Sequence, residues 1–166
     1  MRIVLSAGER VSYRRILMTV VFAASGVSQA AARDLAVVSN KANAVSELSV
    51  ADLAKVCKAQ TNRWPDGKPV TVILRAPSTP EMRIVLEKIY ELQEGQMKEL
   101  IATANHGRTN HPAIIVVEDD ADLVNRVAST PGAIGLVDVY AINSAVAVVK
   151  VAGKLPLEPG YVLHGN

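Results

Sequence analysis

The sequence predicts an α/β domain with a mainly parallel sheet flanked by helices. At 166 residues, about half of them apolar, the chain has the length of one domain and can bury a sizeable core. Short apolar runs rich in β-branched residues alternate with helical patterns, and this alternation is typical of a parallel sheet covered by helices. The expected strands are 35–40, 70–74, 113–117, 132–138 and 145–151.

The first expected helix follows the first strand and has clear start signals. Ser49 as N-cap, with Asp52 three residues later, forms the pattern of a capping box. Val50, Leu53 and Cys57 then fall on one face of the helix. We therefore expect Cys57 in the core, because a reactive thiol needs a basic and exposed setting.

Two further helices are expected. One is long and amphipathic, begins at Pro80, and would bend at Gly95 if it bends at all. The other follows the strand at 113–117, has acidic residues in its first turn, where the helix dipole favours them, and ends at Pro131 and Gly132. The apolar positions of the long helix are Met82, Val85, Leu86, Ile89, Met97, Leu100 and Ile101.

Residues 1–32 have the pattern of a signal peptide, which leaves 33–166 as the mature domain. A basic segment, 1–15, precedes a short apolar run, and small residues offer cleavage sites after Ala30 or Ala32. The chain is therefore expected to be periplasmic or secreted, with no membrane span after cleavage. The alternative, an uncleaved segment that tethers the protein to the membrane, stays open at this point.

Removal of the signal segment changes the charge of the chain. The segment holds four of the 18 basic residues and one of the 16 acidic residues, so the net charge falls from +2 to −1. A mature chain without basic excess is not expected to bind nucleic acid. Cys57 is the one cysteine, so no internal disulfide can form in an oxidising compartment.

The stretch RAPSTPEMR, residues 75–83, is the candidate functional site. Arg75, Ser78, Thr79 and Arg83 supply guanidinium and hydroxyl donors next to an expected helix start, which is the chemistry that seats an oxyanion. The same residues also suit a plain helix end, with Thr79 as N-cap and Pro80 at the first helical position. Helix capping explains Ser78 and Thr79 but gives Arg75 no role.

The order of several motifs resembles the phosphate-binding family of periplasmic substrate-binding proteins that feed ABC importers. The segment TNRWPDGKPV is followed by the arginine and Ser/Thr loop, then by VASTPGAIGLVDV and by VKVAGKLPLEPGYVL. Trp64, Asp66, Gly67, Arg75 and the run 131–135 match the family pattern. The resemblance covers residues 35–163.

The resemblance implies a single three-layer lobe of a type II periplasmic-binding-protein fold. Family members resemble two such lobes that close on the ligand, so a second subunit or a homodimer would have to complete the site. It implies binding of phosphate or a similar oxyanion, weak for one lobe alone, for ABC transport or sensing with a cognate permease. The alternative is an envelope interaction module that keeps one lobe and binds no ligand.

Other residue patterns favour structural roles. The acids Glu118, Asp119, Asp120 and Asp122 are expected to stabilise a helix start rather than bind a cation. His106 and His111 share one polar loop without a third metal ligand, and Trp64 is expected to be a packing anchor beside a turn. No catalytic triad pattern stands out, so we expect no enzyme, no metal and no cofactor.

Overall fold

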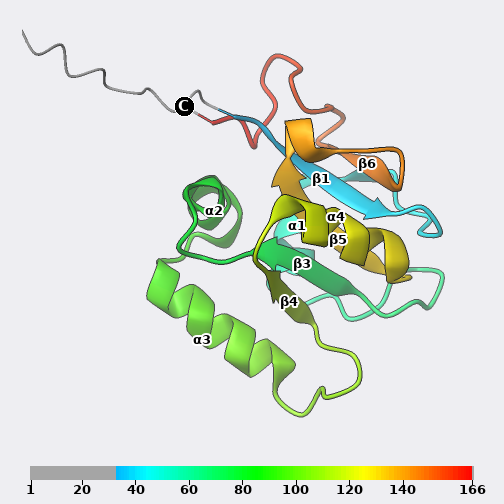
Figure 1. The fold of residues 1–166 in the computed structure, drawn as a ribbon, viewed down its shortest axis with the longest axis vertical. Coiled ribbons are helices and arrows are strands. Elements are labelled where there is room, and N and C mark those ends of the chain that lie inside the picture. The colour runs from blue at the N-terminus through cyan, green and yellow to red at the C-terminus, as the bar shows by residue number, and fades with distance from the viewer. Residues whose placement is uncertain (1–32, 166) are drawn as a thin grey trace, which may run out of the picture. The chain divides into compact units, whose positions relative to one another are not determined.

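The computed structural model describes residues 33–165, which fold into one sheet with helices on both faces (Figure 1). The predicted signal peptide, 1–32, lies outside the described residues. Within residues 33–165, no helix is both long and apolar enough to cross a membrane. In chain order the elements are β1 (Leu35–Asn40), β2 (Glu47–Leu48), α1 (Val50–Cys57), β3 (Thr71–Arg75), α2 (Pro80–Val85), a π-helical turn (Leu86–Tyr90), α3 (Glu94–Asn105), β4 (Ile114–Val117), α4 (Asp120–Ser129), β5 (Ala133–Asp138), a 3-10 turn (Val139–Ala141) and β6 (Val146–Val151).

The sheet is mainly parallel, which confirms the predicted fold class. Its strand order is β2-β6-β1-β5-β3-β4. Strand β1 runs antiparallel to both of its neighbours, β5 and β6, while the pairs β3–β4, β3–β5 and β2–β6 are parallel. The carboxyl ends of β3, β4 and β5 therefore lie along one edge of the sheet, and their amino ends lie along the opposite edge.

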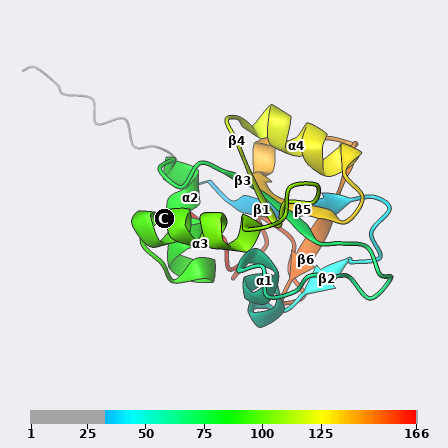
Figure 2. The same cartoon turned by 90° about the horizontal axis from the view of Figure 1, so that it is seen from below.

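Two apolar clusters, one on each face of the sheet, make the predicted three layers. Along β3, Val72 and Leu74 join the cluster under α1, α2 and α3, whereas Ile73 joins the cluster under α4. This alternation follows from the two-residue period of a strand. Figure 2 shows α4 on one side of the strands and α1 on the other.

The start of α1 is as predicted. Ser49 is the N-cap, its hydroxyl oxygen accepts the Asp52 backbone N–H at 3.0 Å, and its hydroxyl donates to Asp52 Oδ2 at 2.7 Å. These contacts satisfy one of the unpaired donors of the first turn. Leu53 and Cys57 point into the core, as the helical pattern indicated.

The prediction of one long helix from Pro80 is wrong in one respect: the helix ends at Glu91 rather than bending at Gly95. After α2 the chain continues as the π-helical turn, and Glu91 then adopts a left-handed conformation with φ of 54°. The wider π turn buries Leu86 and Tyr90 together against the sheet. A new helix, α3, begins where Gln93 and Gln96 form a capping box.

Candidate functional site

The loop from β3 to α2 holds the predicted site residues. Thr79 is the N-cap of α2 in extended conformation, and Pro80 occupies the first helical position, as predicted. The Thr79 hydroxyl makes no capping bond but donates to the Ala76 carbonyl oxygen at 2.9 Å. Its oxygen lone pairs stay available to accept, while its proton is engaged inside the loop.

Arg75 turns toward α4 and pairs with a carboxylate of its own chain. Its Nη1 lies 2.8 Å from Asp120 Oδ1, and the two side chains are 18% and 24% exposed. The pairing follows from the register, because Arg75 stands opposite Val117 in the parallel pair β3–β4 and Asp120 begins α4 three residues later. The charge of Arg75 is thus largely neutralised by a residue of the same chain.

A hollow of about 550 Å³ brings the other three predicted residues together. We call it the carboxyl-edge hollow. Ser78, Thr79 and Arg83 line it, whereas Arg75 does not. The lining carries one positive side chain against three carboxylates, so its formal charge is negative. The remaining lining residues are Pro77, Leu86, Glu87, Glu91, Leu92, Gln93 and Glu94.

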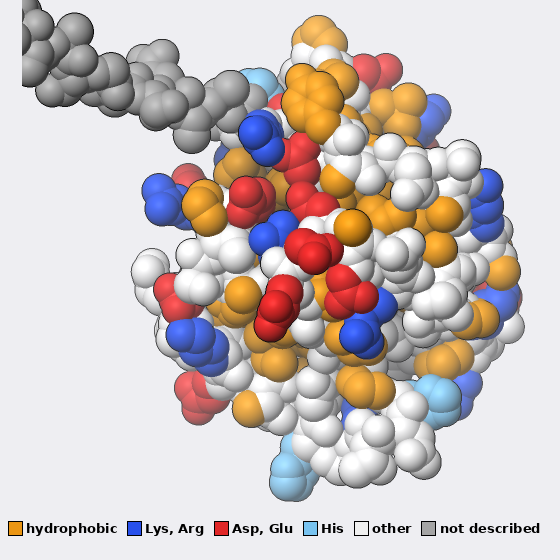
Figure 3. All heavy atoms as spheres, in the orientation of Figure 1, with side chains coloured by type: hydrophobic (Ala, Val, Ile, Leu, Met, Phe, Trp, Pro, Cys, Tyr) orange, Lys and Arg blue, Asp and Glu red, His pale blue; other side chains and the backbone are white. Residues whose placement is uncertain are grey.

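Three of the four acids predicted to stabilise the start of α4 lie there, Asp119 as N-cap and Asp120 and Asp122 in the first turn, whereas Glu118 precedes the cap. The Asp119 carboxylate accepts the Asp122 backbone N–H at 2.7 Å and caps the helix, and Asp122 pairs with Arg126 one turn later. Figure 3 shows carboxylates spread across the face that carries α4, with basic side chains among them. Among residues 33–165, no group of three His, Cys, Asp or Glu side chains is arranged to hold a metal ion.

The two motifs that carry the family resemblance meet in space. Trp64 is buried, as predicted, and its indole Nε1 donates to the Gly132 carbonyl oxygen at 2.8 Å. Gly132 has φ of +87°, and a Cβ atom built there would lie 2.0 Å from the Pro69 carbonyl oxygen. Only glycine fits this approach. The contact explains both motifs as packing of the turn before β3 against the start of β5.

Cys57 lies in the core, which confirms its predicted structural role. The residue is fully buried, and burial raises the pKa of its thiol to about 12. The Tyr90 hydroxyl donates to the Cys57 carbonyl oxygen at 3.1 Å and ties the π-helical turn to α1. The thiol is therefore kept protonated and inert at neutral pH.

Sequence reasoning missed the carboxylates that act as partners at the carboxyl edge of the sheet. Besides Asp120, the buried Asp138 at the end of β5 pairs with Arg33 at 3.1 Å and accepts the Tyr140 backbone N–H. The available signal was position: Asp138 ends an apolar run predicted to be a strand, and Asp120 lies three residues after the end of another. Parallel strands bring such positions to one edge, although the sequence does not say which arginine each acid meets.

Loss of the Asp120 carboxylate is expected to destabilise the fold. We expect Asp120→Asn to lower the free energy of unfolding by about 1–3 kcal/mol, because the half-buried Arg75 guanidinium loses its charged partner. Urea unfolding of the two single variants Asp120→Asn and Arg75→Gln and of the double variant measures the coupling. Additive losses would mean that the pair contributes nothing beyond its separate side chains.

Comparisons with known proteins agree with this architecture. A family model described as "PBP superfamily domain" matches residues 21–162. The fold is similar to an ABC-type phosphate transport receptor from Vibrio cholerae, with a TM-score of 0.65 and 17% identity over 81% of this chain and 54% of that chain. It is also similar to PstS from Borrelia burgdorferi, with a TM-score of 0.61 and 14% identity over 81% of this chain and 55% of that chain.

A third similar structure is a phosphate ABC transporter substrate-binding protein with bound phosphate from Clostridium perfringens, with a TM-score of 0.55 and 18% identity over 74% of this chain and 46% of that chain. The chain thus spans about half the length of these proteins. A search of curated protein sequences found no match. The family model covers most of the chain and the fold agrees with it, so this chain belongs to the PBP superfamily and has the fold of its phosphate-type substrate-binding proteins.

Proposed function

We propose that this chain is an exported, non-enzymatic half-receptor that holds phosphate or a similar oxyanion for ABC transport or sensing. The observation that carries the proposal is the carboxyl-edge hollow, in which Ser78, Thr79 and Arg83 face one space beside the end of β3. The Ser78 hydroxyl and the Arg83 guanidinium are donors that suit an oxyanion, whereas the Thr79 hydroxyl already donates to the Ala76 carbonyl oxygen. The similar structures named above, which include one with bound phosphate, make phosphate the first ligand to test.

The charges around the hollow and the free-energy cost of association indicate that one lobe binds the ion weakly. Two charge-assisted hydrogen bonds contribute roughly 3–6 kcal/mol, whereas association costs about 4–15 kcal/mol. Arg75 is held by Asp120, and Glu87 and Glu91 repel an anion in the same hollow. A second subunit, in a homodimer or a complex with another lobe, would enclose the ion and exclude water, and an ABC permease would be the transport partner.

The charge of the hollow favours a second candidate function. Arg83 stands against Glu87, Glu91 and Glu94 in the lining. A hollow of this charge suits basic side chains of a protein partner better than an anion. The second candidate is therefore an envelope interaction module that retains one lobe of the fold and binds no phosphate.

Titration of the full chain with inorganic phosphate separates the two candidates. We expect the backbone amide NMR signals of Ser78 and Thr79 to shift and to saturate in the millimolar range. Arg83→Gln should weaken this binding about tenfold or more, because it removes a charge-assisted hydrogen bond.

Arg126→Gln is the matched control, since Arg126 is an exposed arginine paired with Asp122 on α4 and lies outside the hollow. It should leave the titration unchanged. If the Ser78 and Thr79 signals do not move at tens of millimolar phosphate, the half-receptor proposal is wrong for this lobe. A titration with a short basic peptide that moves the signals of Glu87 and Glu91 would then support the interaction module.

A further inference from the structure

A second hollow lies at the opposite edge of the sheet from Arg75. It has a volume of about 680 Å³, and we call it the amino-edge hollow. Two segments line it: the turn before β3, with Asn62, Arg63 and Pro69, and the loop 107–111 before β4. Because β3 and β4 are parallel, the residues that precede them share one edge, while Arg75 ends β3 at the other edge.

Among residues 33–165, the lining of the amino-edge hollow is basic and contains no carboxylate. Arg63, Arg108 and His111 face it together with polar uncharged residues and Pro69. In the described part of the chain, neither Arg63 nor Arg108 has a carboxylate within 4.0 Å, whereas Arg33, Arg75 and Arg126 each pair with an aspartate. The two guanidinium charges at this hollow are therefore uncompensated.

Both arginines are nevertheless held in place by neutral acceptors. Arg63 Nη1 donates to the Gly67 carbonyl oxygen at 2.7 Å, and Arg108 Nη2 donates to Asn62 Oδ1 at 2.8 Å. Each bond uses one of five guanidinium N–H donors. An anchored guanidinium loses less conformational entropy when it binds an anion than a free one does.

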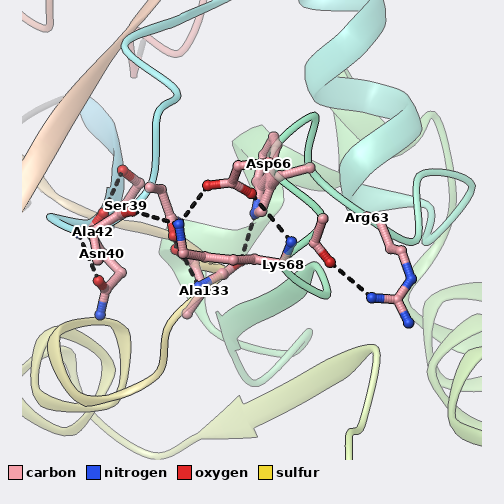
Figure 4. Close-up of polar contacts among 11 residues, drawn as sticks. Ser39, Asn40, Ala42, Arg63, Asp66, Lys68 and Ala133 are labelled. Atoms are coloured by element: carbon pink, nitrogen blue, oxygen red, sulfur yellow. Dashed lines mark hydrogen bonds and ion pairs between the residues drawn. The ribbon is translucent and has the colours of Figure 1, made fainter.

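The acid nearest in sequence to Arg63 is occupied by a lysine. Asp66 pairs with Lys68, whose hydrogen bond lowers the pKa of the Asp66 carboxyl group. In Figure 4 the Arg63 side chain lies apart from the Asp66–Lys68 pair. Its Nη1 donates instead to the Gly67 carbonyl oxygen. The Asp66 carboxylate is thus paired with Lys68, and Arg63 of the same turn lines the hollow without a carboxylate partner among the described residues.

We infer that the amino-edge hollow binds the phosphate group of an organic ester. Arginine forks match phosphate oxygens, and two of them balance a dianion. The Asn62 amide and Thr109 hydroxyl add neutral donors to the same lining. The volume exceeds the size of a bare tetrahedral ion and falls in the range of pockets for small organic molecules. The ester is either a soluble phosphomonoester, which is a dianion, or the phosphodiester headgroup of an anionic phospholipid, which is a monoanion; both present charged phosphate oxygens to the two arginines.

The test uses the full chain with two probes, sn-glycerol 3-phosphate in solution and phosphatidylglycerol vesicles. We expect sn-glycerol 3-phosphate to shift the backbone amide NMR signals of Asn62 and of residues 107–111. Arg63→Gln and Arg108→Gln should each weaken binding about tenfold or more, because each removes a charge-assisted hydrogen bond. Arg126→Gln should have no effect, since its charge lies on α4.

The two probes distinguish the source of the phosphate. If sn-glycerol 3-phosphate shifts these NMR signals, the ligand is a soluble phosphate ester. Co-sedimentation with phosphatidylglycerol but not phosphatidylcholine vesicles, lost in Arg63→Gln, assigns a lipid headgroup. No response to either probe, or an equal loss with Arg126→Gln, would overturn the inference. Thermal unfolding checks each variant, and Arg63→Gln, at an exposed position, keeps the test decisive if Arg108→Gln unfolds.

The proposal for the amino-edge hollow and the proposal for the carboxyl-edge hollow can be refuted independently of each other. The shifts at residues 107–111 should survive Arg83→Gln, and the shifts at Ser78 and Thr79 should survive Arg63→Gln. Inorganic phosphate that moves only the Ser78 and Thr79 signals would leave the proposed function standing. An absence of ester binding in the same sample would then overturn the amino-edge site alone.

Discussion

Trp64→Ala is expected to lower the free energy of unfolding by about 3–5 kcal/mol, a large share of the stability of a domain of this size. The indole is 6% exposed and packs in the cluster under α1, α2 and α3. Its removal leaves a cavity and also deprives the Gly132 carbonyl oxygen of the indole N–H. Urea unfolding followed by far-UV circular dichroism measures the loss.

Matched variants separate the two contributions of this side chain. Trp64→Phe keeps most of the ring but not the donor, so a loss of about 1–2 kcal/mol is expected. Gly132→Ala should be severely destabilising by a different route, since its Cβ would overlap the Pro69 carbonyl oxygen. Tyr140→Ala, at a residue 79% exposed, should change stability little. Equal losses for Trp64→Ala and Tyr140→Ala would contradict the anchor role of Trp64.

The strands and the first helix could be predicted because their signals are local. Runs of β-branched residues mark β3 and β4, and the Ser49 cap marks the start of α1. The antiparallel direction of β1 could not be predicted in the same way. A buried strand has the same apolar composition in either direction, so its orientation depends on pairing with distant segments.

The break at Glu91 also depends on tertiary contacts. The apolar spacing continues through this region, and no proline or glycine marks the break. What ends the helix is the burial of Ile89 and Tyr90 in a wider turn, together with the bond from the Tyr90 hydroxyl to the Cys57 carbonyl oxygen, 33 residues away in sequence. Such packing overrides helix propensity.

The candidate site shows the same division between local and distant information. Ser78, Thr79 and Arg83 lie within six residues of one another, so one loop and one helical turn place them at a common hollow. The partner of Arg75 is Asp120, 45 residues later, and only the register of β3 against β4 brings the two together. A candidate site predicted from the sequence can therefore name donors but cannot say which of them already form an ion pair.

Stability is expected to fall steeply above pH 10. Burial raises the pKa of the Cys57 thiol to about 12, and burial also raises the pKa values of the Tyr90 and Tyr161 hydroxyls above their ordinary range. The unfolded chain releases these protons at ordinary pKa values of about 9 for cysteine and about 10 for tyrosine, while the folded chain retains them. Their contribution to stability is thus complete below pH 9 and is lost as the pH rises toward the folded pKa values.

The part of this stability loss that comes from the Cys57 thiol can be measured separately. Each group contributes a slope of about 1.4 kcal/mol per pH unit between its unfolded and folded pKa values, so three groups reach up to about 4 kcal/mol per unit. Urea unfolding of the wild type and of Cys57→Ala from pH 8 to 11 gives the slopes. Lysine ionisation affects both proteins alike, so the difference isolates the thiol. The variant should be shallower by about 1.4 kcal/mol per unit above pH 9, and equal slopes would mean that water reaches the thiol in the folded protein.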